Sequence, residues 1–133
     1  MAKKIFISYH SDTEGTTHKN LLVAWSKNDS NHFDIKFDDT SVGVSINSDN
    51  ADYIKRVIKG KIKESSVFLS LVGENTHKSD WCLWENEKAV ELGKKIVVVK
   101  IKSTYTTPEN LYGVGANFAY SFTYDAIKKA IDG

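Results

Sequence analysis

The stretch Ile96-Val97-Val98-Val99-Lys100-Ile101 is short, is rich in β-branched residues and is bounded by Lys94-Lys95 and Ser103-Thr104. This composition predicts a β-strand. Near the N-terminus, Lys4–Tyr9 is apolar at consecutive positions, which indicates a central parallel strand covered on both faces. Three further segments have strand patterns: Phe33–Phe37, Val67–Val72 and the shorter Phe118–Ser121.

Helical patterns alternate with these strands. A first helix is expected to start near Thr16 or Thr17, and the others are expected after the capping residues Asn50, Ser79 and Thr123. Gly93 is placed to end the third helix. Strands and helices that alternate at this spacing require right-handed parallel crossovers. We therefore expect an α/β fold: a single flavodoxin-like domain over residues 1–133, with a five-stranded parallel sheet and helices on both faces.

Composition excludes several classes of protein. The chain has 133 residues, of which 41% are hydrophobic and 26% charged, with a net charge of +1 and a single cysteine, Cys82. One cysteine excludes an internal disulfide, and the balanced charge argues against nucleic acid or a membrane surface as partner. The sequence shows no export signal and no apolar run of about 20 residues. These features favour a cytoplasmic protein.

Parallel α/β sheets bind ligands beyond the carboxyl ends of their strands. In this chain that edge comprises the polar segments 8–17, 38–50 and 73–85. His18, His32 and His77 lack the spacing of metal ligands, so no metal site is expected.

Glu85 is the most unusual residue of the predicted third helix. On a helical projection it lies in the middle of an apolar arc that contains Trp81, Cys82, Ala89 and Leu92. A partly desolvated carboxylate near the ligand-binding edge is a candidate reactive group. The alternative is an ordinary surface acid, and that interpretation suits Glu87 and Glu91 on the opposite side.

Four motifs together resemble those of TIR domains, and most closely the TIR-like ThsB group of the bacterial Thoeris antiphage system. They are Phe6–Tyr9, Phe37–Asp39, Ser65–Val72 and Ser79–Glu85. In the last motif, tryptophan is followed four positions later by glutamate, as in TIR proteins that cleave NAD. Residues 40–50 correspond to the BB loop of that family.

The resemblance implies an enzyme that breaks the nicotinamide–ribose bond of NAD and cyclises the product into a second messenger, which a separate effector protein senses. Its catalytic residue would be Glu85, and Trp81 would pack against the cationic nicotinamide ring. NAD is then the substrate, and no cofactor is expected. Self-association through the BB loop is a further expectation. The candidate substrate-binding residues are Ser8, His10, Asp38, Asp39, Ser45 and Trp81.

Each of these residues also has a structural interpretation. Trp81 can be a core aromatic residue, Ser8 and His10 can cap a strand end, and Asp38, Asp39 and Ser45 suit turns.

Two other functions stay open. A non-catalytic TIR interaction module has nearly the same sequence pattern. A flavodoxin-like FMN carrier fits the hydroxyl-rich segment 11–17, although Asp12 and Glu14 would repel the FMN phosphate. A response-regulator receiver fits less well, because no paired acids follow the first strand.

Overall fold

The computed structural model describes residues 3–10, 12–28, 33–36, 49 and 51–133. Its centre is a parallel five-stranded sheet with the strand order β2-β1-β3-β4-β5. The strands are β1 (Lys3–Tyr9), β2 (Phe33–Lys36), β3 (Val67–Val72), β4 (Lys95–Lys100) and β5 (Asn117–Ala119).

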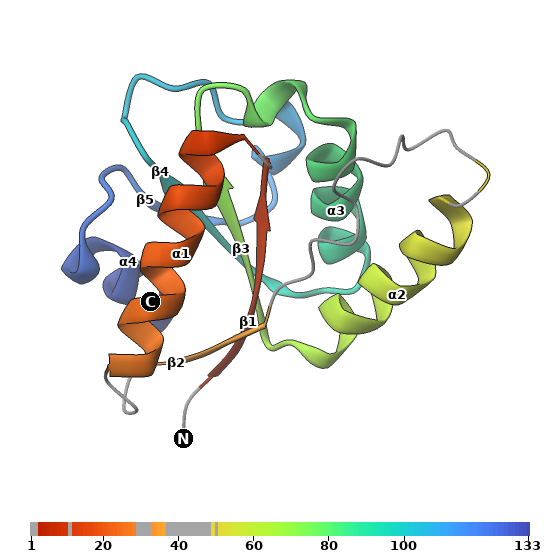
Figure 1. Ribbon diagram of the computed structural model, residues 1–133, viewed down its shortest axis with the longest axis horizontal. Coiled ribbons are helices and arrows are strands. Elements are labelled where there is room, and N and C mark those ends of the chain that lie inside the picture. Colours follow the sequence, from red (N-terminus) through yellow and green to blue (C-terminus); the bar gives the residue numbers. More distant parts are fainter. Residues whose placement is uncertain (1–2, 11, 29–32, 37–48, 50) are drawn as a thin grey trace.

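Among the described residues, four α-helices cover this sheet on both faces (Figure 1). They are α1 (Thr13–Asn28), α2 (Ala51–Glu64), α3 (Asp80–Glu91) and α4 (Tyr124–Asp132). The described residues also contain two short 3-10 turns. One, η1 (Thr76–Lys78), lies between β3 and α3, and the other, η2 (Glu109–Leu111), lies between β4 and β5. The predicted α/β class, with a parallel sheet between helices, is confirmed.

Alternate side chains of the central strands pack in two separate hydrophobic cores, one on each face of the sheet. Ile5 and Ile7 of β1 belong to the core under α1 and α4, whereas Phe6 belongs to the core under α2 and α3. This alternation follows from the two-residue period of a strand. It places Ser8, two residues after Phe6, on the face that α3 covers.

The ends of α3 agree with the sequence prediction. Ser79 Oγ accepts a hydrogen bond from the Cys82 N–H at 3.2 Å and so caps the first turn. Gly93 adopts φ +68°, a left-handed conformation that favours glycine, immediately after the helix. Local signals therefore determine where α3 begins and ends.

The predicted start of α1 was wrong by three to four residues. The helix begins at Thr13, because Asp12 Oδ1 accepts a hydrogen bond from the Gly15 N–H at 2.8 Å and caps it there. Gly15 itself belongs to the first turn, where a Cβ would lie 2.1 Å from the His10 carbonyl oxygen. Residues 13–15, which were expected to precede the helix, thus form its first turn, and the close approach of the His10 carbonyl leaves room only for glycine at position 15.

In the part of the chain that the structure describes, no helix is both long and apolar enough to span a membrane.

Candidate active site

Glu85 lies inside the protein, where α3 packs on the sheet. Its side chain is 4% exposed, within a buried stripe of α3 that also contains Cys82, Asn86 and Ala89. This stripe has the three- and four-residue spacing of one helix face. The prediction that Glu85 lies on the sheltered face of this helix is therefore confirmed, although that face also contains the polar Asn86.

Ser8 orients the Glu85 carboxylate. Its hydroxyl donates a hydrogen bond to Glu85 Oε1 at 2.8 Å, and Ser8 is only 1% exposed. The two residues are 77 positions apart in the sequence. They meet because the Ser8 side chain points to the face of the sheet that α3 covers. A hydrogen bond to a charged acceptor in a buried setting holds that acceptor in one orientation. The arrangement can present a preorganised negative charge to a ligand.

Cys82 lies one turn before Glu85 on the same buried stripe and is 1% exposed. Burial, reinforced by the nearby negative charge of Glu85, raises the pKa of its thiol to about 12. The thiol therefore stays protonated at neutral pH and is no nucleophile.

Trp81 is half-buried and packs against the core under α2 and α3. Its ring lies edge-on to that of Trp84, with centroids 6.0 Å apart. The ammonium groups of Lys55 and Lys88 both lie 5.8 Å from the Trp84 ring centroid. The structure thus gives Trp81 a packing role, and its contact with a ligand stays a prediction.

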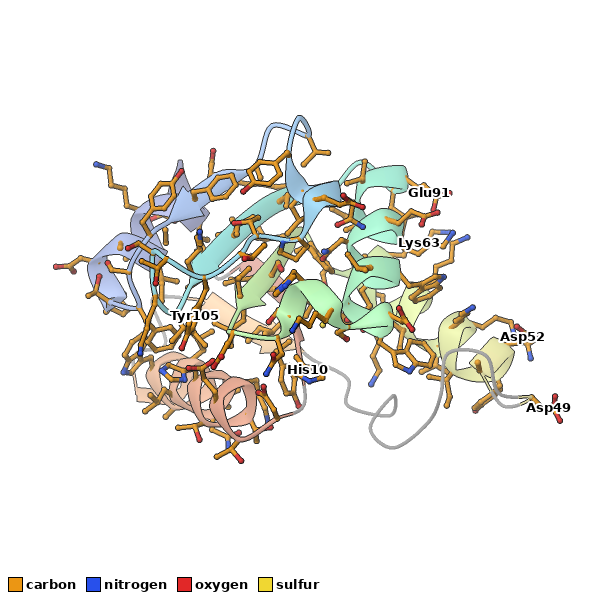
Figure 2. The ribbon with its side chains drawn as sticks, turned by 90° about the horizontal axis from the view of Figure 1, so that it is seen from above. His10, Asp49, Asp52, Lys63, Glu91 and Tyr105 are labelled. Carbon is orange, nitrogen blue, oxygen red and sulfur yellow. The ribbon has the colours of Figure 1, made fainter. Side chains whose placement is uncertain are left out.

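His10 lies at the carboxyl end of β1, where Figure 2 labels it, and is half-buried. Its carbonyl oxygen accepts the Asp12 N–H at 2.9 Å and so takes part in the turn that leads into α1. The predicted residues Asp38, Asp39 and Ser45 lie outside the described residues, as does almost all of the expected BB loop.

Sequence reasoning missed a second hydroxyl–carboxylate pair, which lies at the same edge of the sheet. Tyr105 donates to Glu14 Oε2 at 2.7 Å, and the Glu74 N–H donates to Glu14 Oε1 at 3.0 Å. The hydrogen bond to the Glu14 carboxylate is the main cause that raises the pKa of Tyr105 to about 12. Glu14 thereby ties α1 to the connections that follow β3 and β4, and no local pattern signals a contact across 91 residues.

A network of amide side chains, which was also not predicted, connects α3 to η2. Asn86 is fully buried and donates to Asn110 Oδ1 at 3.1 Å, while Asn110 donates to the Leu83 carbonyl at 2.8 Å. The helical spacing from Cys82 could have indicated that Asn86 is buried. Its partner in η2 could not have been found in this way.

The described residues contain no group of three or more His, Cys, Asp or Glu side chains that could hold a metal ion. The side of α3 opposite Glu85 carries the exposed acids Glu87 and Glu91, as expected. Glu91 forms an ion pair with Lys88 at 2.8 Å, which lowers the pKa of Glu91, and Figure 2 shows Glu91 far from His10.

Comparison with known proteins places the chain in a family. The model of the Thoeris protein ThsB, TIR-like domain, matches residues 6–106. A Bacillus cereus (strain MSX-D12) protein named "Putative cyclic ADP-D-ribose synthase ThsB1" is 28% identical over 142 residues, which cover all of this chain and 68% of the relative.

Among solved structures, the CMP N-glycosidase BcmB of Clostridium botulinum has a TM-score of 0.64 at 14% identity, covering 98% of this chain and all of the other. The TIR domains of the activated Roq1 resistosome have a TM-score of 0.57 at 18% identity, covering 83% of this chain and 62% of theirs. These two likenesses concern the fold alone. Since the family model spans most of the chain, the protein belongs to the TIR-like domain family of the Thoeris protein ThsB.

Proposed function

We propose that this protein cleaves the bond between nicotinamide and ribose in NAD and closes the ADP-ribose product into a cyclic messenger. The observation that carries the proposal is the buried Glu85 carboxylate, which accepts a hydrogen bond from Ser8 on the face of α3 that packs on the sheet. Family membership and the name of the Bacillus cereus relative support the same chemistry.

One carboxylate is enough for this reaction. Most glycosidases need a second, protonated carboxyl group because their leaving group is poor. Nicotinamide instead leaves from a pyridinium: the bond from ribose C1′ to the ring nitrogen breaks, and its electron pair neutralises the ring. Glu85 then stabilises the positive charge that develops on the sugar, in surroundings where little water screens the interaction.

The other candidate residues have supporting roles in this proposal. Ser8 positions the carboxylate, Trp81 faces the cationic ring, and His10 contacts a ribose or phosphate. Asp38, Asp39 and Ser45 bind the adenosine side or shape the BB loop. The product is decided when a nucleophile attacks C1′: an atom of the adenosine part of the same molecule gives a cyclic product, and water gives linear ADP-ribose.

The wider context of the proposal follows the Thoeris family. The cyclic product would act on a separate effector protein, and copies of the chain would associate through the BB loop. The FMN carrier stays the less favoured alternative, because the carboxylates of Asp12 and Glu14 lie at the start of α1, where the FMN phosphate would bind, and would repel it.

The decisive experiment incubates the purified protein with NAD, measures free nicotinamide and identifies the nucleotide products by mass spectrometry. We expect nicotinamide and a cyclic product from the wild type and from Glu87→Gln, a change at an exposed acid of the same helix, but not from Glu85→Gln. If NAD stays intact at high protein concentration, also with phage lysate added, the protein is an interaction module. If linear ADP-ribose is the sole product, cyclisation is refuted.

A further inference from the structure

Two separate contacts hold α3 on different sides of the helix. On one side, the Glu85 carboxylate accepts the hydrogen bond from Ser8 of β1 at 2.8 Å. On another side, Asn86 donates to Asn110 Oδ1 at 3.1 Å, and Asn110 Nδ2 donates to the Leu83 carbonyl at 2.8 Å. Asn110 therefore joins two positions of α3 that flank Glu85 in the sequence.

The helical period places these two contacts well apart around α3. Successive residues of an α-helix are about 100° apart around its axis. Asn86 follows Glu85 by one residue and Leu83 precedes it by two, so both lie about 100–160° from Glu85 in the same direction. A helix that is held on one side only can rock about that contact. The second contact, through Asn110, restricts the rotation of α3 about its own axis.

The η2 turn that carries Asn110 is itself anchored in the protein. Leu111, the last residue of η2, is 1% exposed and belongs to the core under α2 and α3. Its N–H donates to the Pro108 carbonyl at 3.1 Å, which closes the turn. Asn86 is fully buried, so water has little access to its end of the hydrogen bond with Asn110. Asn110 thus joins α3 to a fixed part of the core.

A small rotation of α3 is enough to displace the reacting end of Glu85. Side chains extend to about 5–6 Å from the axis of an α-helix, so a rotation of about 10° moves a carboxylate at that radius by about 1 Å. A displacement of about 1 Å at a reacting group can reduce a catalytic rate by about a hundredfold. The contacts that set the rotation of α3 would therefore also set the efficiency of Glu85 in the proposed reaction.

We propose that Asn110 is a positioning residue, which holds α3 in the rotation that aims the Glu85 carboxylate at the substrate. The inference rests on the proposed function, because Glu85 is the group that is aimed. Asn110 acts through Asn86 and through the Leu83 carbonyl, and it needs no contact with the substrate. The connection between β4 and β5, which contains η2, thereby takes part in catalysis.

The test compares NAD cleavage by Asn110→Ala with NAD cleavage by Asn117→Ala. Asn117 is the matched control, because its Nδ2 also donates to a helix carbonyl, that of Ala130 in α4, at 3.1 Å. Helix α4 packs on the other core of the sheet, away from Glu85. Both substitutions should lower the melting temperature. We expect kcat for nicotinamide release to fall about tenfold in Asn110→Ala, with KM nearly unchanged, and to stay as in the wild type in Asn117→Ala.

A double variant separates positioning from a general loss of packing. Asn86→Ala removes the partner of Asn110 on α3, so the two substitutions break the same connection. We therefore expect the double variant to have about the same kcat as Asn110→Ala alone. Losses of kcat that multiply would overturn the inference. If Asn110→Ala does not fold, Asn110→Ser takes its place, because serine stays polar at this half-buried position but is too short to reach both partners.

The outcomes also separate this inference from the proposed function. If the wild type releases no nicotinamide, the proposed function is refuted, and the rotation of α3 is then tested by alkylation of Cys82, which shares the buried stripe of Glu85. Alkylation should be about tenfold faster in Asn110→Ala than in Asn117→Ala. The inference is overturned if the two variants are alkylated at the same rate, if their kcat values fall equally, or if Asn110→Ala changes KM alone.

Discussion

Two glutamates on helices that cover opposite faces of the sheet each accept a hydrogen bond from a hydroxyl group. Glu85 of α3 accepts from Ser8 at 2.8 Å, and Glu14 of α1 accepts from Tyr105 at 2.7 Å. Glu85 is 4% exposed, whereas Glu14 is half-buried and also accepts a backbone N–H. The same pair of chemical groups thus serves two purposes, and burial decides between them. The buried carboxylate of Glu85 suits electrostatic catalysis. The partly solvated carboxylate of Glu14 instead connects α1 to the segments that follow β3 and β4.

The largest expected effect concerns catalysis. Glu85→Gln keeps the side-chain shape but removes the charge, so nicotinamide release should fall by about a hundred- to a thousandfold. Glu14→Gln should leave the rate within a fewfold of the wild type, because the Glu14 carboxylate accepts hydrogen bonds from Tyr105 and Glu74 and so joins segments of the fold. Steady-state rates of both variants test this contrast. Equal losses of rate in the two variants would contradict the proposed difference between Glu85 and Glu14.

The next prediction uses the chain's single cysteine to measure how sheltered the Glu85 region is. Because the pKa of Cys82 is raised from 9.0 to about 12, its reaction with iodoacetamide at neutral pH should be on the order of a thousandfold slower in the folded protein than in urea. Mass spectrometry of the alkylated chain gives both rates. Similar rates in the two conditions would mean that the stripe around Glu85 is open to solvent.

Ser8→Ala should weaken both the function and the fold. Loss of the hydrogen bond leaves a buried carboxylate without its hydroxyl donor, so the free energy of unfolding should fall by about 1–3 kcal/mol. The catalytic rate should fall about tenfold, because the carboxylate is no longer held in one orientation.

The matched control for Ser8→Ala is Ser70→Ala on the neighbouring strand, where β1 and β3 pair Ser8 with Ser70. The Ser70 hydroxyl is fully buried and has no hydrogen-bond partner among the described residues. Its removal should leave the stability unchanged or raise it. A loss equal to that of Ser8→Ala in urea denaturation would contradict a special role for the Ser8 hydrogen bond.

The smallest effect is expected at the second pair. Tyr105→Phe removes the hydroxyl that Glu14 accepts and should lower the melting temperature less than Ser8→Ala does. The pKa of Tyr105 is raised from 10.0 to about 12 in the folded protein, so its stabilising contribution is complete below pH 10 and is lost as the pH rises through about 12.

An absorbance titration of the phenolate groups can check this pKa. The chain has six tyrosines. Compared with the wild type, the titration of Tyr105→Phe should lack one phenolate transition, and that transition should lie near pH 12. If the missing transition lies near pH 10 instead, Glu14 does not hold the hydroxyl in solution.

The sequence was informative wherever a local pattern carried the information. The helical spacing around Glu85 predicted its burial, Ser79 and Gly93 marked the ends of α3, and the apolar run from Ile96 predicted β4. The sequence was misleading at Asp12. The polar residues around it are typical of a loop, so the helix was expected to start later, whereas Asp12 caps the helix.

What the sequence by itself determined is the alternation of strands and helices and the placing of one carboxylate on an apolar helix face. Both depend on residues that are near neighbours in the chain, so periodicity reveals them. Only the tertiary structure decided that Ser8 is the hydrogen-bond partner of Glu85 and that Tyr105 is the partner of Glu14. These partners are 77 and 91 residues apart, and they meet only because the order of strands in the sheet brings their segments together.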